Sequence, residues 1–74
     1  MRPLNHIASD IFQNWKKPNY AAMPYLEAMT YLHSIDDKYY HDDARSIVRY
    51  FLANASAWRG DTARTIKAEL RSML

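Results

Sequence analysis

The chain has 74 residues, 49% of them hydrophobic and 24% charged, with one glycine, three prolines, no cysteine and a formal net charge of +2. This length allows one domain with a modest core, the lack of cysteine excludes disulfides and thiolate metal sites, and so small a net charge does not by itself indicate a nucleic-acid partner. No apolar run approaches the roughly 18 residues of a membrane span and none follows the first residues as in a secretory signal, so we expect no membrane association and a cytoplasmic location.

Two helices are expected in the first half of the chain, over about residues 5–16 and 22–35, because apolar side chains recur there at helical spacing. Pro18 would stop the first helix, and Pro24 suits the first turn of the second. The first stripe consists of Leu4, Ile7, Ala8, Ile11, Phe12 and Trp15, and the second helix carries Ala22, Tyr25, Leu26, Met29 and Leu32 on one side and Ala28, Tyr31 and Ile35 on the other. Because the second helix is apolar nearly all round, we expect another protein or a second copy to cover it.

Two further helices are expected in the second half, over about residues 42–58 and 62–74, after a polar loop at residues 34–41. Asp42 would cap the third helix, Gly60 would end it in a left-handed conformation, and Asp61 or Thr62 would cap the fourth. The inward stripe of the third helix consists of Ala44, Ile47, Val48, Phe51, Leu52, Ala55 and Trp58. The predicted fold class is all-α, a compact four-helix domain spanning residues 1–74 with short connections.

Tyrosines outside these stripes are the main indication of a binding surface. Tyr50 projects opposite the inward stripe of the third helix, among small residues. Tyrosine joins apolar area to a polar tip at low entropic cost and is enriched at protein interfaces, although it also tolerates partial exposure without a partner. The predicted protein-binding residues are Tyr31, Tyr39, Tyr40 and Tyr50.

Basic residues are concentrated in the second half of the chain. Residues 44–74 carry six basic and two acidic side chains, whereas residues 1–43 carry four basic and six acidic ones. If the last two helices pack as an antiparallel pair, their cations form one surface for nucleic-acid phosphates, made of Arg45, Arg49, Arg64, Lys67 and Arg71. The plainer interpretation is that these side chains solvate exposed helix faces. The connection around Gly60 also resembles the turn of a helix-turn-helix, but charged residues fall where that motif faces the core.

Metal-binding and catalytic side chains show no arrangement that predicts a site. Six metal-competent side chains lie close together in sequence: His33, Asp36, Asp37, His41, Asp42 and Asp43. Their spacing fits neither a common zinc site nor a calcium-binding loop, and helix capping and loop solvation account for them. Since there is also no thiol, nucleophile motif or phosphate-cradling glycine loop, we expect no metal, no cofactor, no catalytic residue and no enzymatic activity.

The segment Ile47–Leu70 resembles part of a group of short uncharacterised proteins encoded in bacteriophage genomes. The resemblance rests on Trp58-Arg59-Gly60 and on the predicted helices on either side of it. It implies a phage origin and a host partner such as a defence nuclease or a transcription factor. The leading hypothesis is therefore a non-enzymatic protein-binding module that modulates or inhibits a host protein. A small DNA- or RNA-binding protein is the alternative, and a homodimer is a third hypothesis.

Overall fold

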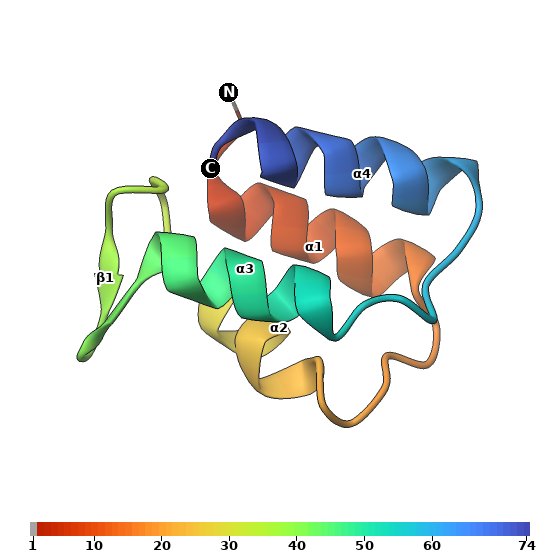
Figure 1. Ribbon diagram of the computed structural model, residues 1–74, viewed down its shortest axis with the longest axis horizontal. Helices are drawn as coiled ribbons and strands as arrows, with labels where there is room; N and C mark the ends of the chain where they lie inside the picture. Colours follow the sequence, from red (N-terminus) through yellow and green to blue (C-terminus); the bar gives the residue numbers. More distant parts are fainter. Residues whose placement is uncertain (1) are drawn as a thin grey trace.

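The computed structural model describes residues 2–74, and within them the chain forms four α-helices and one two-stranded antiparallel sheet. The elements are α1 (Leu4–Asn14), α2 (Met23–Met29), β1 (Lys38–Tyr39), β2 (Asp42–Asp43), α3 (Ala44–Ala53) and α4 (Asp61–Ser72) (Figure 1). The mostly helical character predicted from the sequence is confirmed. An all-α fold is not, because the short sheet was not predicted.

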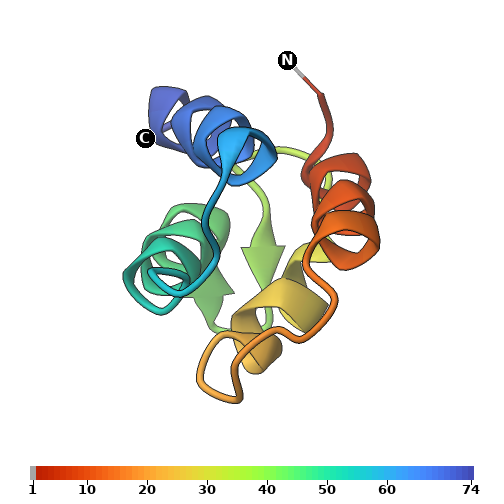
Figure 2. The same ribbon diagram turned by 90° about the vertical axis from the view of Figure 1, so that its right-hand side faces the viewer.

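The helices surround one shared core. In Figure 1, α1 runs parallel to α3 and antiparallel to α4, and Figure 2 shows it across the core from both of them. Viewed along the helices in Figure 2, α2 closes the bundle on the side away from α4, and α2 contacts both α1 and α3. The radius of gyration of 10.9 Å is close to the roughly 11 Å of a compact chain of this length. No helix within residues 2–74 has the length and apolarity needed to cross a bilayer.

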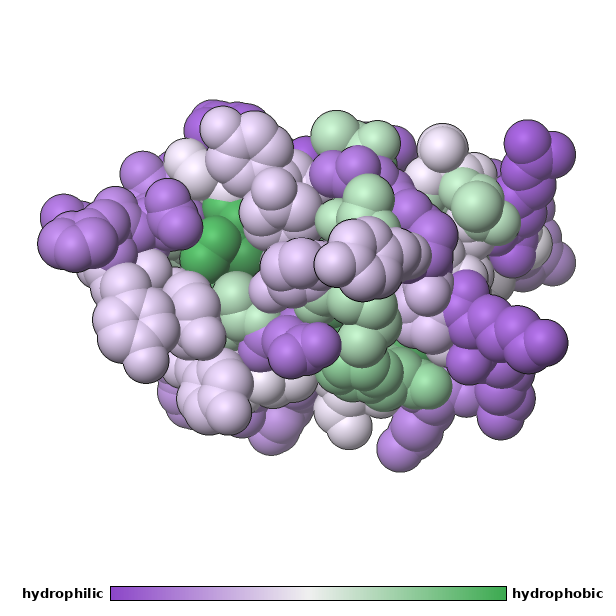
Figure 3. All heavy atoms as spheres, turned by 90° about the horizontal axis from the view of Figure 1, so that it is seen from below, coloured by the Kyte–Doolittle hydropathy of each residue, from purple (hydrophilic) through white to green (hydrophobic). Residues whose placement is uncertain are grey.

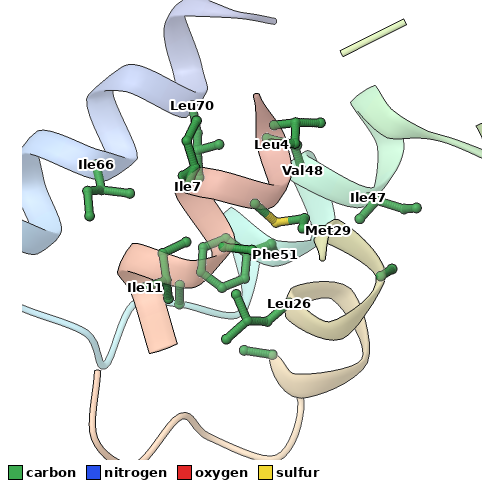
Figure 4. Packing of buried hydrophobic residues seen from close by; sticks show 14 of the residues in the cluster. Leu4, Ile7, Ile11, Leu26, Met29, Ile47, Val48, Phe51, Ile66 and Leu70 are labelled. Atoms are coloured by element: carbon green, nitrogen blue, oxygen red, sulfur yellow. The ribbon is translucent and has the colours of Figure 1, made fainter. Parts of the chain in front are cut away.

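The core takes side chains from all four helices. Figure 4 shows how the larger ones converge, with Leu4, Ile7 and Ile11 from α1, Leu26 and Met29 from α2, Ile47, Val48 and Phe51 from α3, and Ile66 and Leu70 from α4. At one end of the core, the indole rings of Trp15 and Trp58 stack with centroids 5.6 Å apart, and Phe51 meets Trp15 edge-on at 6.3 Å. Phe12, which was predicted to face the core, is 38% exposed instead.

The prediction that the third helix continues to Trp58 is wrong, because α3 ends at Ala53. The amide side chain of Asn54 donates to the carbonyl oxygen of Tyr50 at 2.8 Å, and Asn54 is the C-cap. Asparagine competes for backbone groups in this way and is a poor helix former. Ala55 and Trp58 are buried nevertheless, since the chain turns back toward the core. The periodicity therefore predicted their burial correctly and their helical conformation incorrectly.

The second helix is also shorter than predicted, ending at Met29 rather than near residue 35. Thr30 is the C-cap, and its hydroxyl donates to the carbonyl oxygen of Glu27 at 2.5 Å. Tyr31 and Ile35 consequently lie beyond α2, so the second apolar strip of the predicted helix is not on the helix. The length of α2 therefore gives no reason of its own to expect a covering partner.

Two predicted helix caps are displaced by one position. Asp43, not Asp42, caps α3, and its carboxylate accepts from the amide of Ser46 at 2.7 Å. Gly60 has a positive φ of 108° as expected, but it precedes α4 as its N-cap instead of ending α3. Asp61 is therefore the first residue of α4 and not its cap.

The predicted polar loop before α3 contains a small hairpin. β1 and β2 pair in antiparallel register, Lys38 with Asp43 and Tyr39 with Asp42, and Tyr40 and His41 connect them. Strands of two residues have too few alternating positions to give a sequence signal. The hairpin joins directly onto α3 and projects beyond the bundle (Figure 1).

The first turn of α1 is capped by backbone groups from a distant part of the chain. Pro3, at the N-cap, provides no side-chain acceptor. The amides of Leu4 and Asn5 donate instead to the carbonyl oxygens of His33 and Leu32, each at 2.9 Å. These bonds satisfy donors that a helix start otherwise leaves free, and they tie α1 to the segment after α2.

Ion pairs join the start of the chain to two helices. The guanidinium of Arg2 pairs with Asp10 on α1 and with Glu69 on α4, the latter at 2.7 Å. These hydrogen bonds from Arg2 lower the pKa of Glu69 below its ordinary value of 4.5. The pairs are partly exposed, so they add little to stability individually, but they hold α1 and α4 in register.

Candidate functional site

Three of the four predicted tyrosines come together around the hairpin. The rings of Tyr31 and Tyr39 stack with centroids 5.9 Å apart, and Tyr40 meets Tyr39 edge-on at 4.7 Å. Tyr31 and Tyr40 are mostly exposed, whereas Tyr39 is half-buried and packs against the core. Tyr39 therefore supports the other two rings and offers only part of its own surface.

The fourth predicted tyrosine belongs to a separate pair. Tyr50 on α3 stacks on Tyr25 of α2 with centroids 5.4 Å apart, and Tyr50 remains 55% exposed. Tyr25 was predicted as a core residue, but it is only half-buried. We call these five residues the tyrosine surface: Tyr25, Tyr31, Tyr39, Tyr40 and Tyr50. Figure 3 views the molecule from the α2 side, and pale ring-shaped side chains gather there at the hairpin end with green apolar atoms between them.

Tyr40 has an unfavourable backbone conformation. Its φ is 57°, in the left-handed region that glycine and asparagine adopt readily, and it is the one non-glycine residue with positive φ in residues 2–74. Its side chain is 84% exposed. A bulky residue gains little from packing at such a position while its backbone is strained, and strain of this kind is concentrated at functional sites.

The aspartates near the hairpin have structural roles. The carboxylate of Asp37 accepts from the amides of Ser34 and His33, each at 2.9 Å, and these bonds lower its pKa. The bond from the amide of Ser46 likewise lowers the pKa of Asp43. Among residues 2–74, no three side chains of the metal-binding types converge. The acidic groups thus organise the loop and cap α3.

The predicted basic surface is divided in the structure. Arg45 lies at the start of α3, where its guanidinium donates to the carbonyl oxygen of Met73 and pairs with Asp36, both at 3.0 Å. These contacts hold the end of α4 and the loop before the hairpin against α3. Arg45 is therefore held at the C-terminal end of α4.

A second group of cations surrounds a pocket of about 300 Å³ beside α4. Its lining consists of Ser56, Trp58, Arg59, Gly60, Ala63, Arg64 and Lys67. We call this feature the basic pocket. Arg64 and Lys67 were predicted as phosphate-binding residues, whereas Arg59 was missed because its position was assigned to a helix corner. Neither Arg45 nor Arg49 lines the pocket.

Lys67 occupies a defined position at the basic pocket. Its ammonium donates to the carbonyl oxygen of Trp58 at 2.6 Å and lies 6.0 Å from the centre of the Trp58 rings. Partial burial lowers the pKa of Lys67, and the positive charges of Arg71 and Arg59 lower it further. Arg71 therefore lies near enough to add to the positive potential, although it does not line the pocket.

The connection between α3 and α4 does not support the helix-turn-helix interpretation. That motif joins its helices by a turn of about three or four residues. Here the longer segment 54–60 separates the two helices. The segment around Gly60 instead shapes the basic pocket.

The tyrosine surface and the basic pocket are built from different elements and share no residue. The first lies on α2, the segment that follows it, the hairpin and α3, and the second on α4 and the loop that precedes it. Comparison of the chain with protein-family models, with curated proteins and with solved structures finds no match.

Proposed function

We propose that this chain is a non-enzymatic protein-binding module whose partner docks on the tyrosine surface. The observation that carries the proposal is Tyr40, an exposed aromatic residue in a strained conformation at the tip of the hairpin. Its one ring contact, with Tyr39, gives folding little reason to keep a tyrosine there. Contact with a partner gives such a reason, because a ring held at a projecting tip inserts readily into a pocket of the partner.

Stacking prepares the tyrosine surface for binding. Tyr31, Tyr40 and Tyr50 are each more than half exposed, yet each ring already rests on another tyrosine. Binding therefore costs less side-chain entropy than it would with free rings. Restricted aromatic side chains with polar tips are the usual anchors of small binding domains. On the resemblance to phage proteins, the partner would be a host protein.

Affinity capture from a bacterial lysate tests the proposal. We expect the wild type to retain a protein that Tyr50→Ala and Tyr40→Gly retain poorly, with a loss of about 1–2 kcal/mol for each variant, or roughly tenfold in affinity. Tyr20→Ala is the matched control, because Tyr20 is 94% exposed and lies outside the tyrosine surface. Equal capture by all four proteins would contradict the proposal.

Sedimentation of the purified chain separates a foreign partner from a second copy. If the mass rises with concentration and Tyr50→Ala remains a monomer, the partner is a second copy of this chain. A constant monomer mass would mean that the partner of the tyrosine surface is a different protein.

Nucleic-acid binding is a second candidate, supported by the grouping of cations at the basic pocket. Phosphate contacts made by Arg64, Lys67 and Arg71 would give binding that weakens steeply with salt. Titration with generic duplex DNA tests this candidate. Micromolar binding that is lost on replacing Arg64 and Lys67 together would support it, and no binding at low salt would end it.

A further inference from the structure

The basic pocket contains positive charge and no carboxylate in its lining. It lies between the loop Ser56–Gly60 and the side of the first two turns of α4, with Trp58 beneath it, buried to 95%. Three of its lining side chains are cations, namely Arg59, Arg64 and Lys67. Arg71 adds a fourth positive charge nearby. A bound anion would offset the mutual repulsion of these positive charges.

The pocket cations are only partly neutralised by the protein itself. Arg64 pairs with Asp61, but both side chains are highly exposed, so this pair is weak and easily exchanged for another. Lys67 bonds to a neutral carbonyl group, which leaves its charge uncompensated. Within residues 2–74, Arg59 makes no ion pair. The pocket therefore has cations available for a ligand without the cost of breaking a buried salt bridge.

The placement of these cations indicates a compact anion rather than a long one. A nucleic-acid strand needs a row of cations along its backbone. The row predicted from the sequence is interrupted, because Arg45 contacts Met73 at the C-terminal end of α4 whereas the pocket lies beside the first half of that helix. Arg59, Arg64 and Lys67 instead line one pocket. Its volume of about 300 Å³ is at the lower end of the range for small-ligand sites.

We infer that the basic pocket binds a single phosphate group, held by Arg59, Arg64 and Lys67. A phosphate monoester carries close to two negative charges near pH 7 and three acceptor oxygens, which match the three cations better than a carboxylate does. The bond from Lys67 to the Trp58 carbonyl holds the ammonium at the pocket edge before the ligand arrives. This inference is independent of the protein-binding role of the tyrosine surface.

Titration of the isotope-labelled chain with inorganic phosphate, followed by amide NMR shifts at constant ionic strength, tests the inference. We expect saturable shifts confined to residues 56–67, with chloride producing none. Arg59→Gln should weaken the affinity about fivefold or more. Because Arg59 is exposed and makes no ion pair within residues 2–74, this variant should fold normally.

Arg49→Gln is the matched control, since it removes one exposed cation from α3 outside the pocket. Equal weakening by Arg49→Gln and Arg59→Gln would overturn the inference, as would shifts spread over the whole chain. A short oligonucleotide with and without a 5′ phosphate distinguishes the source of the phosphate. Binding that requires the terminal phosphate supports a monoester site. Binding that grows with oligonucleotide length and shifts the amides of α3 would replace the inference with a nucleic-acid surface.

Discussion

Tyr40 and Tyr39 are adjacent in sequence and have opposite roles. Tyr39 is half-buried against the core and supports its neighbours, so its ring belongs to the fold. Tyr40 is exposed and strained, so the fold gains little from it. The sequence predicted both as binding residues because neither fits a helical stripe. Tyr39 is half-buried because it lies in the hairpin, and strands of two residues are too short to be predicted from the sequence.

Replacement of each residue separates these roles. Tyr40→Gly relieves a left-handed conformation that costs roughly 1–2 kcal/mol and loses one edge-on ring contact of about 0.5–1.5 kcal/mol. The two effects nearly cancel, so the free energy of unfolding should change by less than about 1 kcal/mol. Tyr39→Ala should lower it by about 2 kcal/mol or more. Urea denaturation measures both, and a large loss in Tyr40→Gly would mean that its ring is structural.

The ends of the elements are set by side chains that bond to nearby backbone. Asn54 and Thr30 stop α3 and α2 earlier than periodicity predicts, and Asp43 starts α3. The stripe pattern counts apolar residues, so it continues through any position that remains buried after the helix has ended. Helix identity and order were therefore predictable, but helix length was not.

The cap of α3 should be visible in both stability and pH dependence. Asp43→Ala removes the acceptor for the Ser46 amide and should lower Tm by about 4–8 °C at pH 7. Asp43→Asn should retain most of the stability, because its amide oxygen still accepts. Thermal unfolding followed by circular dichroism measures the two shifts, and equal losses in the two variants would mean that the charge matters more than the bond.

Acid should weaken the fold in a defined range. The pKa values of Asp37, Asp43 and Glu69 are lowered in the folded state, from ordinary values of 3.8, 3.8 and 4.5. A lowered folded pKa gives stability that is complete above the unfolded pKa and is lost as the pH falls through the folded pKa. Wild-type stability should therefore be level down to about pH 5 and fall below it. Asp43→Asn should show a smaller fall between pH 5 and pH 3.

At the scale of the whole molecule, the stacked indoles connect parts of the chain that are far apart in sequence. Trp15 follows α1 and Trp58 precedes α4, and Phe51 of α3 completes the group. The sequence placed all three in the core, and the structure confirms this. The sequence could not predict the contacts of Arg45, because its partners Asp36 and Met73 come together only after the chain has folded. Convergence of the pocket cations was unpredictable for the same reason.

Loss of one indole should be severe in so small a domain. A chain of this length has a total stability of about 4–11 kcal/mol, and replacing a buried tryptophan with alanine costs about 3–5 kcal/mol. Trp58→Ala should therefore be largely unfolded or strongly destabilised at 25 °C, whereas Trp58→Phe retains a ring and should remain folded. Circular dichroism at 222 nm during urea titration measures the difference, and a well-folded Trp58→Ala would show that the stack is dispensable.

The backbone cap of α1 has a consequence for the order of events during translation. The amides of Leu4 and Asn5 find their acceptors at Leu32 and His33, which the ribosome adds much later. Until then, α1 has eleven residues and an open first turn, and isolated helices of that length are marginal in water. Residues 4–14 must therefore wait for the segment that follows α2 before they form a stable helix, so α1 is not an independent folding nucleus.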